Sequence, residues 1–239
     1  MTRHVTATLP VVRSVNARAV VAEFVGTAVL LVAIVGSGIM AQRLCGGNVG
    51  LELLANAIAT GGALVAIILA FGPISGAHLN PAVTLADAWQ GGISWKMVLP
   101  YTAAQALGAL LGTAIANGMF GLPFFVVSRH DRSGSTLLLS EFVATFGLLA
   151  VIWGCTRSKP SATPFAVAAY IVGAYWFTPS TSFANPAVTI ARSLTDTFAG
   201  IRPADTPLFI VAQLLGALVA TALFAYLIPL RARSTVRAT

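Results

Sequence analysis

The sequence predicts an all-α membrane protein, in which six transmembrane helices and two re-entrant half-helices form an inverted repeat. Three observations support this fold class. First, 57% of the 239 residues are hydrophobic and only 9% are charged, whereas about a quarter of the residues in a soluble domain are charged. Second, the apolar residues gather in stretches of membrane-spanning length. Third, the second half of the chain repeats motifs of the first half. Because so few charges cannot cover a surface that faces water, we expect the protein to lie in a membrane.

Six apolar stretches have the length of about 20 residues that a helix needs to cross the hydrocarbon. They are roughly residues 19–41, 52–72, 96–118, 136–156, 162–178 and 207–228. The first follows a basic tail, residues 1–18, and is too long for the core of a signal peptide. We therefore expect it to be retained, within a membrane domain of residues 19–230 that precedes a second tail, residues 231–239.

Two further apolar segments, 80–90 and 185–195, are only about half as long as a transmembrane helix. Each begins with Asn-Pro-Ala, and Asn is a favoured N-cap while Pro suits the first helical turn. The preceding residues, GPISGAHL and TPSTSFA, are poor helix formers and are predicted to be extended. Non-helical backbone at membrane depth is tolerated only inside protein or beside a wet cavity. Each segment is therefore predicted to supply half of one span.

Motifs recur in the same order in both halves of the chain. AEFVGT corresponds to SEFVAT, YTAAQALGAL corresponds to FIVAQLLGAL, and NPAVTLA corresponds to NPAVTIA. The first repeat covers about 19–118 and the second about 136–228. Each contains an odd number of full spans, so the second must insert upside down. Inverted repeats of this kind place solute sites near the membrane midplane, at interrupted helices.

The distribution of Lys and Arg predicts that both termini are cytoplasmic and that the protein lies in the cell membrane. With that orientation, the outer side receives the minority of the 14 basic residues. These are Arg43, Arg129, Arg132, Arg192 and Arg202. The net charge of +7 does not indicate a nucleic-acid partner, because the basic residues lie at segment ends and not on one face.

The two half-helices are predicted to meet N-terminus to N-terminus at the membrane centre. Each helix end carries about half a positive charge, which opposes cations and hopping protons. The amides of Asn80 and Asn185 offer donors there, and backbone carbonyls of the preceding segments offer acceptors. The predicted lining residues of these segments are Gly76, Ala77, His78, Leu79, Phe183 and Ala184. A neutral, hydroxylated molecule could exchange its hydration for these groups. The pattern therefore predicts a passive channel for small uncharged solutes.

These residues also resemble those of a known family. The boxes Asn80-Pro81-Ala82 and Asn185-Pro186-Ala187, the approach SGAHLNPA, and the glutamates of AEFVGT and SEFVAT are similar to the motifs of the aquaporin and glycerol-facilitator family over residues 19–228. The resemblance implies a channel domain with a pore in each protomer. It also implies a homotetramer in lipid, no cofactor and no enzymatic activity.

The family sorts solutes at an outer constriction, and its positions correspond here to Thr60, Gly173 or Ala174, Ser182 and Val188. The family usually has arginine at the position of Val188 and an aromatic residue at that of Thr60. We therefore expect an unusually wide mouth without aromatic walls or a cation. Arg192 lies one turn beyond Val188 on the same helix face, where it either supplies the missing charge or is structural. The filter resembles that of a bacterial subgroup associated with arsenic resistance, which adds arsenous acid to glycerol and water as candidate solutes.

Several residues leave alternatives open. Glu23 and Glu141 either accept hydrogen bonds from the irregular segments or relay protons in a coupled secondary transporter, a fold that also uses broken helices. The run Tyr175-Trp176-Phe177 either faces lipid and neighbouring subunits or turns a ring into the passage. Cys45 and Cys155 are small apolar fillers or thiols that touch a soft solute. A closed, junction-like protein is a third possibility.

Overall fold

The computed structural model describes residues 16–228, in which helices are joined by turns and irregular segments and no strand occurs. The helices of this part of the chain are α1 (Ala17–Leu44), α2 (Val49–Ser75), α3 (Pro81–Trp89), α4 (Trp95–Met119), α5 (Ser135–Ser158), the short 3₁₀ turn η1 (Pro160–Ala162), α6 (Thr163–Phe177), α7 (Pro186–Arg192) and α8 (Thr206–Leu227). The predicted tails, 1–18 and 231–239, lie outside the described residues except for residues 16–18. The all-helical class is confirmed.

The helices α1, α2, α4, α5 and α8 are long and apolar enough to cross a membrane. The remaining expected span, 162–178, is shorter: α6 has 15 residues, which corresponds to about 22 Å. Proline explains both of its limits. Pro164 stands in its first turn, and Pro179 follows its end, where a further residue could not donate the next helical hydrogen bond.

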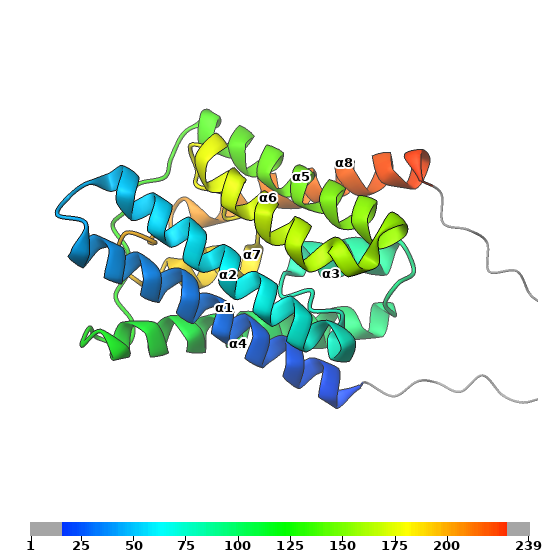
Figure 1. The fold of residues 1–239 in the computed structure, drawn as a ribbon, viewed down its shortest axis with the longest axis horizontal. Helices are drawn as coiled ribbons and strands as arrows, with labels where there is room; N and C mark the ends of the chain where they lie inside the picture. Colours follow the sequence, from blue (N-terminus) through cyan, green and yellow to red (C-terminus); the bar gives the residue numbers. More distant parts are fainter. Residues whose placement is uncertain (1–15, 229–239) are drawn as a thin grey trace, which may run out of the picture.

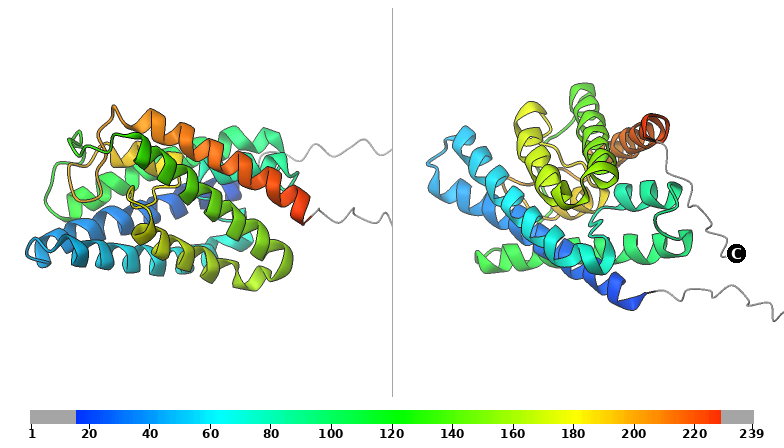
Figure 2. Two further views of the ribbon diagram at one scale, coloured as in Figure 1. Left: turned by 90° about the horizontal axis from the view of Figure 1, so that it is seen from above. Right: turned by 45° about the vertical axis from the view of Figure 1, so that its right-hand side comes forward.

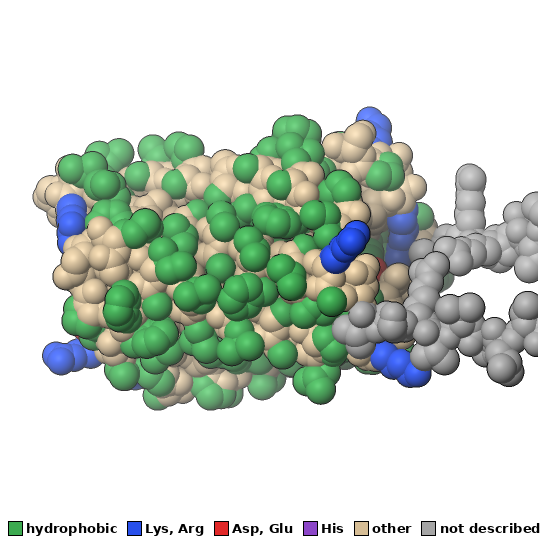
Figure 3. Space-filling view, turned by 90° about the horizontal axis from the view of Figure 1, so that it is seen from below, with side chains coloured by type: hydrophobic (Ala, Val, Ile, Leu, Met, Phe, Trp, Pro, Cys, Tyr) green, Lys and Arg blue, Asp and Glu red, His purple; other side chains and the backbone are tan. Residues whose placement is uncertain are grey.

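The start of α1 and the end of α8 lie at the same end of the molecule, on the right of Figure 1. We call this the near end and the opposite one the far end. The half-helices α3 and α7 lie on opposite sides of the middle, α3 toward the near end and α7 toward the far end (Figure 1). Seen from above, the long helices run obliquely to the long axis (Figure 2). On the face shown in Figure 3, hydrophobic side chains fill the middle and Lys and Arg lie close to the two ends.

Small residues let the long helices of each repeat approach closely. A Cβ atom at Gly108 would overlap the carbonyl oxygen of Phe24, and one at Gly216 would overlap that of Phe142. These contacts join α1 to α4 in the first repeat and α5 to α8 in the second. Such close approach through small residues is the usual way in which membrane helices associate.

The segments before the two Asn-Pro-Ala boxes are not extended, and this part of the prediction was wrong. Helix α2 continues through Pro73 to Ser75, so only residues 76–80 are irregular between α2 and the first half-helix. Several non-glycine residues are left-handed, with φ of 47° at Ala77, 51° at Leu79 and 48° at Ala184. This conformation costs about 1–2 kcal/mol per residue, so the surrounding hydrogen bonds must hold it.

Candidate functional site

The two asparagines of the boxes meet at the centre of the molecule and cross-link the repeats. The Nδ2 group of Asn80 donates to the carbonyl oxygen of Ala184 at 2.8 Å, and that of Asn185 donates to the carbonyl oxygen of Leu79 at 2.8 Å. Each Oδ1 atom caps its own half-helix, because it accepts from the backbone N–H of Ala82 or Ala187. The following residues, Pro81 and Pro186, stand in the first helical turn. In each asparagine, both the nitrogen and the oxygen of the side-chain amide are therefore held by hydrogen bonds.

A fully buried glutamate holds each irregular segment. The carboxylate of Glu23 accepts from the backbone N–H groups of His78 at 3.0 Å and Leu79 at 2.6 Å. The carboxylate of Glu141 accepts from those of Phe183 and Ala184, both at 2.9 Å. Hydrogen bonds to a charged group contribute about 1.5–3 kcal/mol each. These bonds therefore offset the strain of the left-handed residues.

A glutamine completes each of these networks. Gln105 donates to Glu23 at 2.8 Å and to Thr84 of α3 at 2.9 Å. Gln213 donates to Glu141 at 2.6 Å and to Thr189 of α7 at 2.8 Å. Both glutamines thus fasten a half-helix to a long helix, and neither lines the central cavity.

A cavity of about 400 Å³ runs from the near end, past Asn80 and Asn185, to Arg192 near the far end. The approach segments contribute Gly76, Ala77, His78, Leu79, Phe183 and Ala184 to its wall. Val83 of α3 and Val188 of α7 line it on either side of the asparagines. Apolar side chains make up most of this wall. Among residues 16–228, no group of three or more His, Cys, Asp and Glu side chains is placed to hold a metal ion.

At the near end, the cavity is lined by a histidine and an aspartate. His78 Nε2 lies 3.6 Å from the Asp87 carboxylate, and His78 Nδ1 lies 3.2 Å from the Thr84 hydroxyl. The ring of Tyr101 packs edge-on against His78, with the ring centroids 5.6 Å apart. The imidazole is therefore held on three sides.

Toward the far end, the wall contains Thr60, Tyr175, Ser182, Val188 and Arg192. The hydroxyl groups of Thr60 and Tyr175 are 3.4 Å apart. The Ser182 Oγ atom is buried and has no hydrogen-bond partner among the described residues. The wall at this level therefore carries one hydroxyl group without a partner and two hydroxyl groups that contact each other.

One expectation for this mouth was wrong. Neither Gly173 nor Ala174 lines the cavity; the contributing residues of α6 are Thr163, Val167, Ile171 and Tyr175. Their spacing of four places them on one helix face, so the inward position falls one residue later than the expected pair. Tyr175 and Arg192 both line this mouth, which agrees with the alternatives of an inward-turned ring and of a charge shifted one turn outward.

The neighbours of Tyr175 follow the other alternative, since Trp176 and Phe177 are exposed on the outer surface. Arg192 is buried, and its guanidinium carbon lies 3.4 Å from the centroid of the Phe183 ring. Its Nε–H donates to the carbonyl oxygen of Ala199. The arginine is thus stacked and anchored in the wall.

A further buried arginine, Arg132, could be placed from the sequence only on the outer side. It belongs to the loop between α4 and α5 and is 7% exposed. Burial lowers the pKa of Arg132 to about 10, which still leaves the guanidinium charged at neutral pH. No motif marks this residue, so only its hydrogen bonds in the folded chain reveal it.

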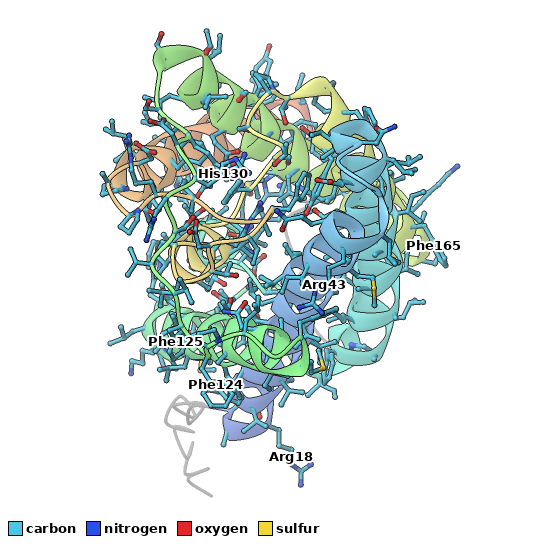
Figure 4. The ribbon with its side chains drawn as sticks, turned by 90° about the vertical axis from the view of Figure 1, so that its left-hand side faces the viewer. Arg18, Arg43, Phe124, Phe125, His130 and Phe165 are labelled. Carbon is cyan, nitrogen blue, oxygen red and sulfur yellow. The ribbon has the colours of Figure 1, made fainter. Side chains whose placement is uncertain are left out.

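Arg132 also lines a second cavity of about 470 Å³ at the far end, together with Glu52, His130 and Asp196. Figure 4 looks onto this end and shows His130 on the α4–α5 loop. Burial, followed by the charges of Arg132 and Arg192, lowers the pKa of His130. At neutral pH this histidine therefore adds no third positive charge to the mouth.

Comparison with known proteins agrees with this geometry. The family model described as "Major intrinsic protein" matches residues 11–182 and 162–238. The chain is 50% identical to Aquaglyceroporin AqpS of Rhizobium meliloti (strain 1021) over 222 residues, which cover 93% of this chain and 94% of that protein. It is 32% identical to Aquaporin Z of Rhodopseudomonas palustris over 231 residues, 90% of this chain and 95% of that protein.

Among solved structures, the X-ray structure of the aquaglyceroporin from Plasmodium falciparum matches with a TM-score of 0.66 and 24% sequence identity. The match covers 90% of this chain and 97% of that one, and it shows a shared fold. Together with the paired Asn-Pro-Ala boxes, these findings assign the chain to the major intrinsic protein family, a family of membrane channels and not of enzymes.

Proposed function

We propose that this chain is a passive channel for small uncharged solutes, namely water, glycerol-sized polyols and arsenous acid. The observation that carries the proposal is the cavity that passes between Asn80 and Asn185 and ends at Arg192. A solute would move through each protomer, and the chain would form a homotetramer. The printed name of its relative, an aquaglyceroporin, supports the inclusion of polyols.

The centre of the cavity favours neutral solutes over cations. The N-termini of α3 and α7 both point toward it, and each carries a partial positive charge. Each asparagine amide has a second N–H beyond the one bonded to the opposite repeat, and both asparagines line the cavity. A hydroxylated solute could accept from these donors, whereas a cation would meet only positive ends.

The far-end mouth would set the upper size of the solute. Val188 stands where the family usually has arginine, so the wall beside it is apolar. The charge is shifted one helical turn outward, to Arg192. We infer that this shift makes the cavity wider at the level of Val188. We also infer that the hydroxyl groups of Thr60 and Ser182 at this mouth form hydrogen bonds with solutes larger than water.

The surroundings of the channel follow from its surface. On the face shown in Figure 3 the middle of the molecule is apolar, as a surface in contact with lipid and neighbouring protomers requires. Arg18, Lys96, Arg157 and Lys159 belong to the near end. In the sequence, the two tails that are joined to this end add Arg3, Arg13, Arg231, Arg233 and Arg237, which assigns nine of the 14 basic residues to it. Because Lys and Arg are in excess on the cytoplasmic side, we place the near end, and both termini, in the cytoplasm.

Stopped-flow light scattering of proteoliposomes tests this function with water, glycerol, urea and arsenous acid. The proposal predicts fast flux of glycerol that rises linearly with its gradient and ignores an imposed proton or sodium gradient. Saturating flux that follows an ion gradient would instead show a coupled transporter, and flux equal to that of empty liposomes would show a closed protein. The carboxylates that such coupling would need, Glu23 and Glu141, are already occupied by backbone N–H groups.

A further inference from the structure

The loop between α4 and α5 is fastened across the far end of the molecule. Its backbone N–H groups at Val126 and Ser128 donate to the carbonyl oxygens of Leu194 and Ser193, at 3.0 and 2.9 Å. Further along, the backbone N–H of Arg132 donates to the Asp205 carboxylate at 2.9 Å. The loop therefore follows the segment that connects α7 to α8, and it carries Arg132 to the far-end mouth.

The Arg132 guanidinium is satisfied by backbone carbonyls and not by an acid. Its Nε–H donates to Gly200 at 2.8 Å, one terminal nitrogen donates to Ser180 at 3.1 Å, and the other donates to Phe198 at 3.5 Å. Ser180 belongs to the irregular segment that leads to the second box, whereas Phe198 and Gly200 follow α7. One side chain from a third segment thus joins two backbone segments of the mouth.

The same stretch of backbone also anchors Arg192. Its Nε–H donates to Ala199, the residue between the two that accept from Arg132. Three consecutive carbonyls, of residues 198, 199 and 200, are therefore shared by two buried arginines. Both guanidiniums also lie near the Phe183 ring, with the Cζ atom of Arg132 at 4.9 Å and that of Arg192 at 3.4 Å from its centroid. A displacement of this backbone would move the acceptor of Arg192.

We propose that Arg132 is a positioning residue for the solute filter, which holds the Arg192 guanidinium in the cavity wall by fixing the backbone of residues 198–200. This inference rests on the proposed channel function. Arg132 acts through Arg192, because Arg192 lines the central cavity and Arg132 does not. The planar fork of arginine suits this task, since it presents several donors in a fixed geometry that a lysine cannot reproduce.

The test compares the glycerol-to-water flux ratio of reconstituted variants. Arg192→Gln shortens a side chain of the wall and is expected to raise the ratio. Arg132→Gln is expected to raise it in the same direction, by about threefold or more, since residues in one network are strongly coupled. The double variant is expected to show no more than the Arg192→Gln shift. A ratio is used because a general loss of folded protein would lower both fluxes together.

Two further variants make the outcome decisive. Arg129→Gln removes the same charge from an exposed position of the same loop and should keep the wild-type ratio. Arg132→Lys keeps the charge but loses the fork, so it should shift the ratio as Arg132→Gln does; it also decides the matter alone if the glutamine variant does not fold. A wild-type ratio in Arg132→Lys, or shifts that multiply in the double variant, would overturn the positioning role. Absence of neutral flux in the wild type would instead contradict the channel function itself.

Discussion

The two repeats build the same frame around the cavity and then differ at its two mouths. In each repeat a buried glutamate accepts two consecutive backbone N–H groups, and a glutamine ties that glutamate to a threonine of the half-helix. The two asparagines donate to the opposite repeat at the same distance, 2.8 Å. The scaffold therefore follows the internal symmetry of the sequence closely.

The difference appears at matching positions of the two boxes. Two residues before each asparagine stand His78 and Phe183, and seven residues after it stand Asp87 and Arg192. At the near end, His78 lies against Asp87; at the far end, Phe183 lies against Arg192. The same contact is thus built from an acid and imidazole at one mouth and from a guanidinium and phenyl ring at the other.

The two repeats thus share the residues that hold the irregular backbone and differ in the residues at the mouths. Residues that hold the irregular backbone are duplicated, because both boxes need the same support for left-handed residues. The residues at the two mouths are not duplicated, since His78 and Asp87 stand at one and Phe183 and Arg192 at the other. Variants placed at matching positions can therefore show which groups belong to the frame and which belong to the filter.

The largest effect is expected from breaking the frame. Glu23→Gln and Glu141→Gln each replace a carboxylate, which accepts at both oxygens, by an amide that has only one acceptor oxygen. Each variant should therefore lose about 3 kcal/mol or more of its free energy of unfolding. Unfolding in detergent, followed by circular dichroism, measures the loss. Glu52→Gln is the matched control, because this buried glutamate makes no side-chain hydrogen bond with the described residues. A wild-type unfolding midpoint for either frame variant would contradict the shared role.

The next effect is expected at the far-end mouth. Val188→Arg adds a second long cation to the wall beside Arg192, and we expect it to reduce glycerol flux about tenfold while water flux falls less, because pore width selects by size. Val188→Thr, which keeps the volume, should retain glycerol flux within about twofold. Stopped-flow measurements on both variants check this. Equal losses of glycerol and water would show that residue 188 is not at the constriction.

A smaller and symmetrical effect is expected at the centre. Asn80→Asp and Asn185→Asp place a carboxylate beside the two helix ends, which weakens the barrier to cations. Both should raise cation conductance severalfold, and to a similar extent, in planar bilayer recordings. If only one variant conducts, the two boxes do not share one central barrier.

The smallest effect is expected at the near-end mouth. Asp87→Asn removes the carboxylate beside His78 but keeps the shape, so neutral flux should change by less than about twofold. Any residual cation leak should fall, in contrast to Arg192→Gln, which should raise it. Glycerol flux and bilayer conductance measured together check both signs. A cation leak that rises in Asp87→Asn would contradict the prediction that the charges at the two mouths act on cations in opposite directions.

Most of the frame could be predicted from the sequence, because it depends on repeated patterns. Duplicated Glu and Asn-Pro-Ala motifs located the half-helices, and the long apolar runs located the spans. The left-handed backbone at Ala77 and Ala184 could not be predicted, since non-glycine residues rarely adopt it. Side-chain acceptors hold it here, because the backbone N–H of Ala77 donates to Ser75 Oγ and that of Ala184 donates to the Glu141 carboxylate.

The filter was less predictable than the frame. A shift of one residue decides whether Ala174 or Tyr175 faces the cavity, and the family pattern does not determine the register of α6. The inward direction of Arg192 depends on the Phe183 ring and on the Ala199 carbonyl, both brought there by tertiary folding. Arg132 belongs to a loop without a motif, so its role follows only from the carbonyls that it binds.

The central claim, that solutes pass inside the protomer beside Val188, is tested most directly by chemical blockage. Val188→Cys is made in a chain in which Cys45 and Cys155 are replaced by serine, and glycerol flux is measured before and after complete reaction with a bulky methanethiosulfonate. The account predicts that modification stops most of the glycerol flux, while the cysteine-free parent is unaffected. Unchanged flux through fully modified protein would contradict it.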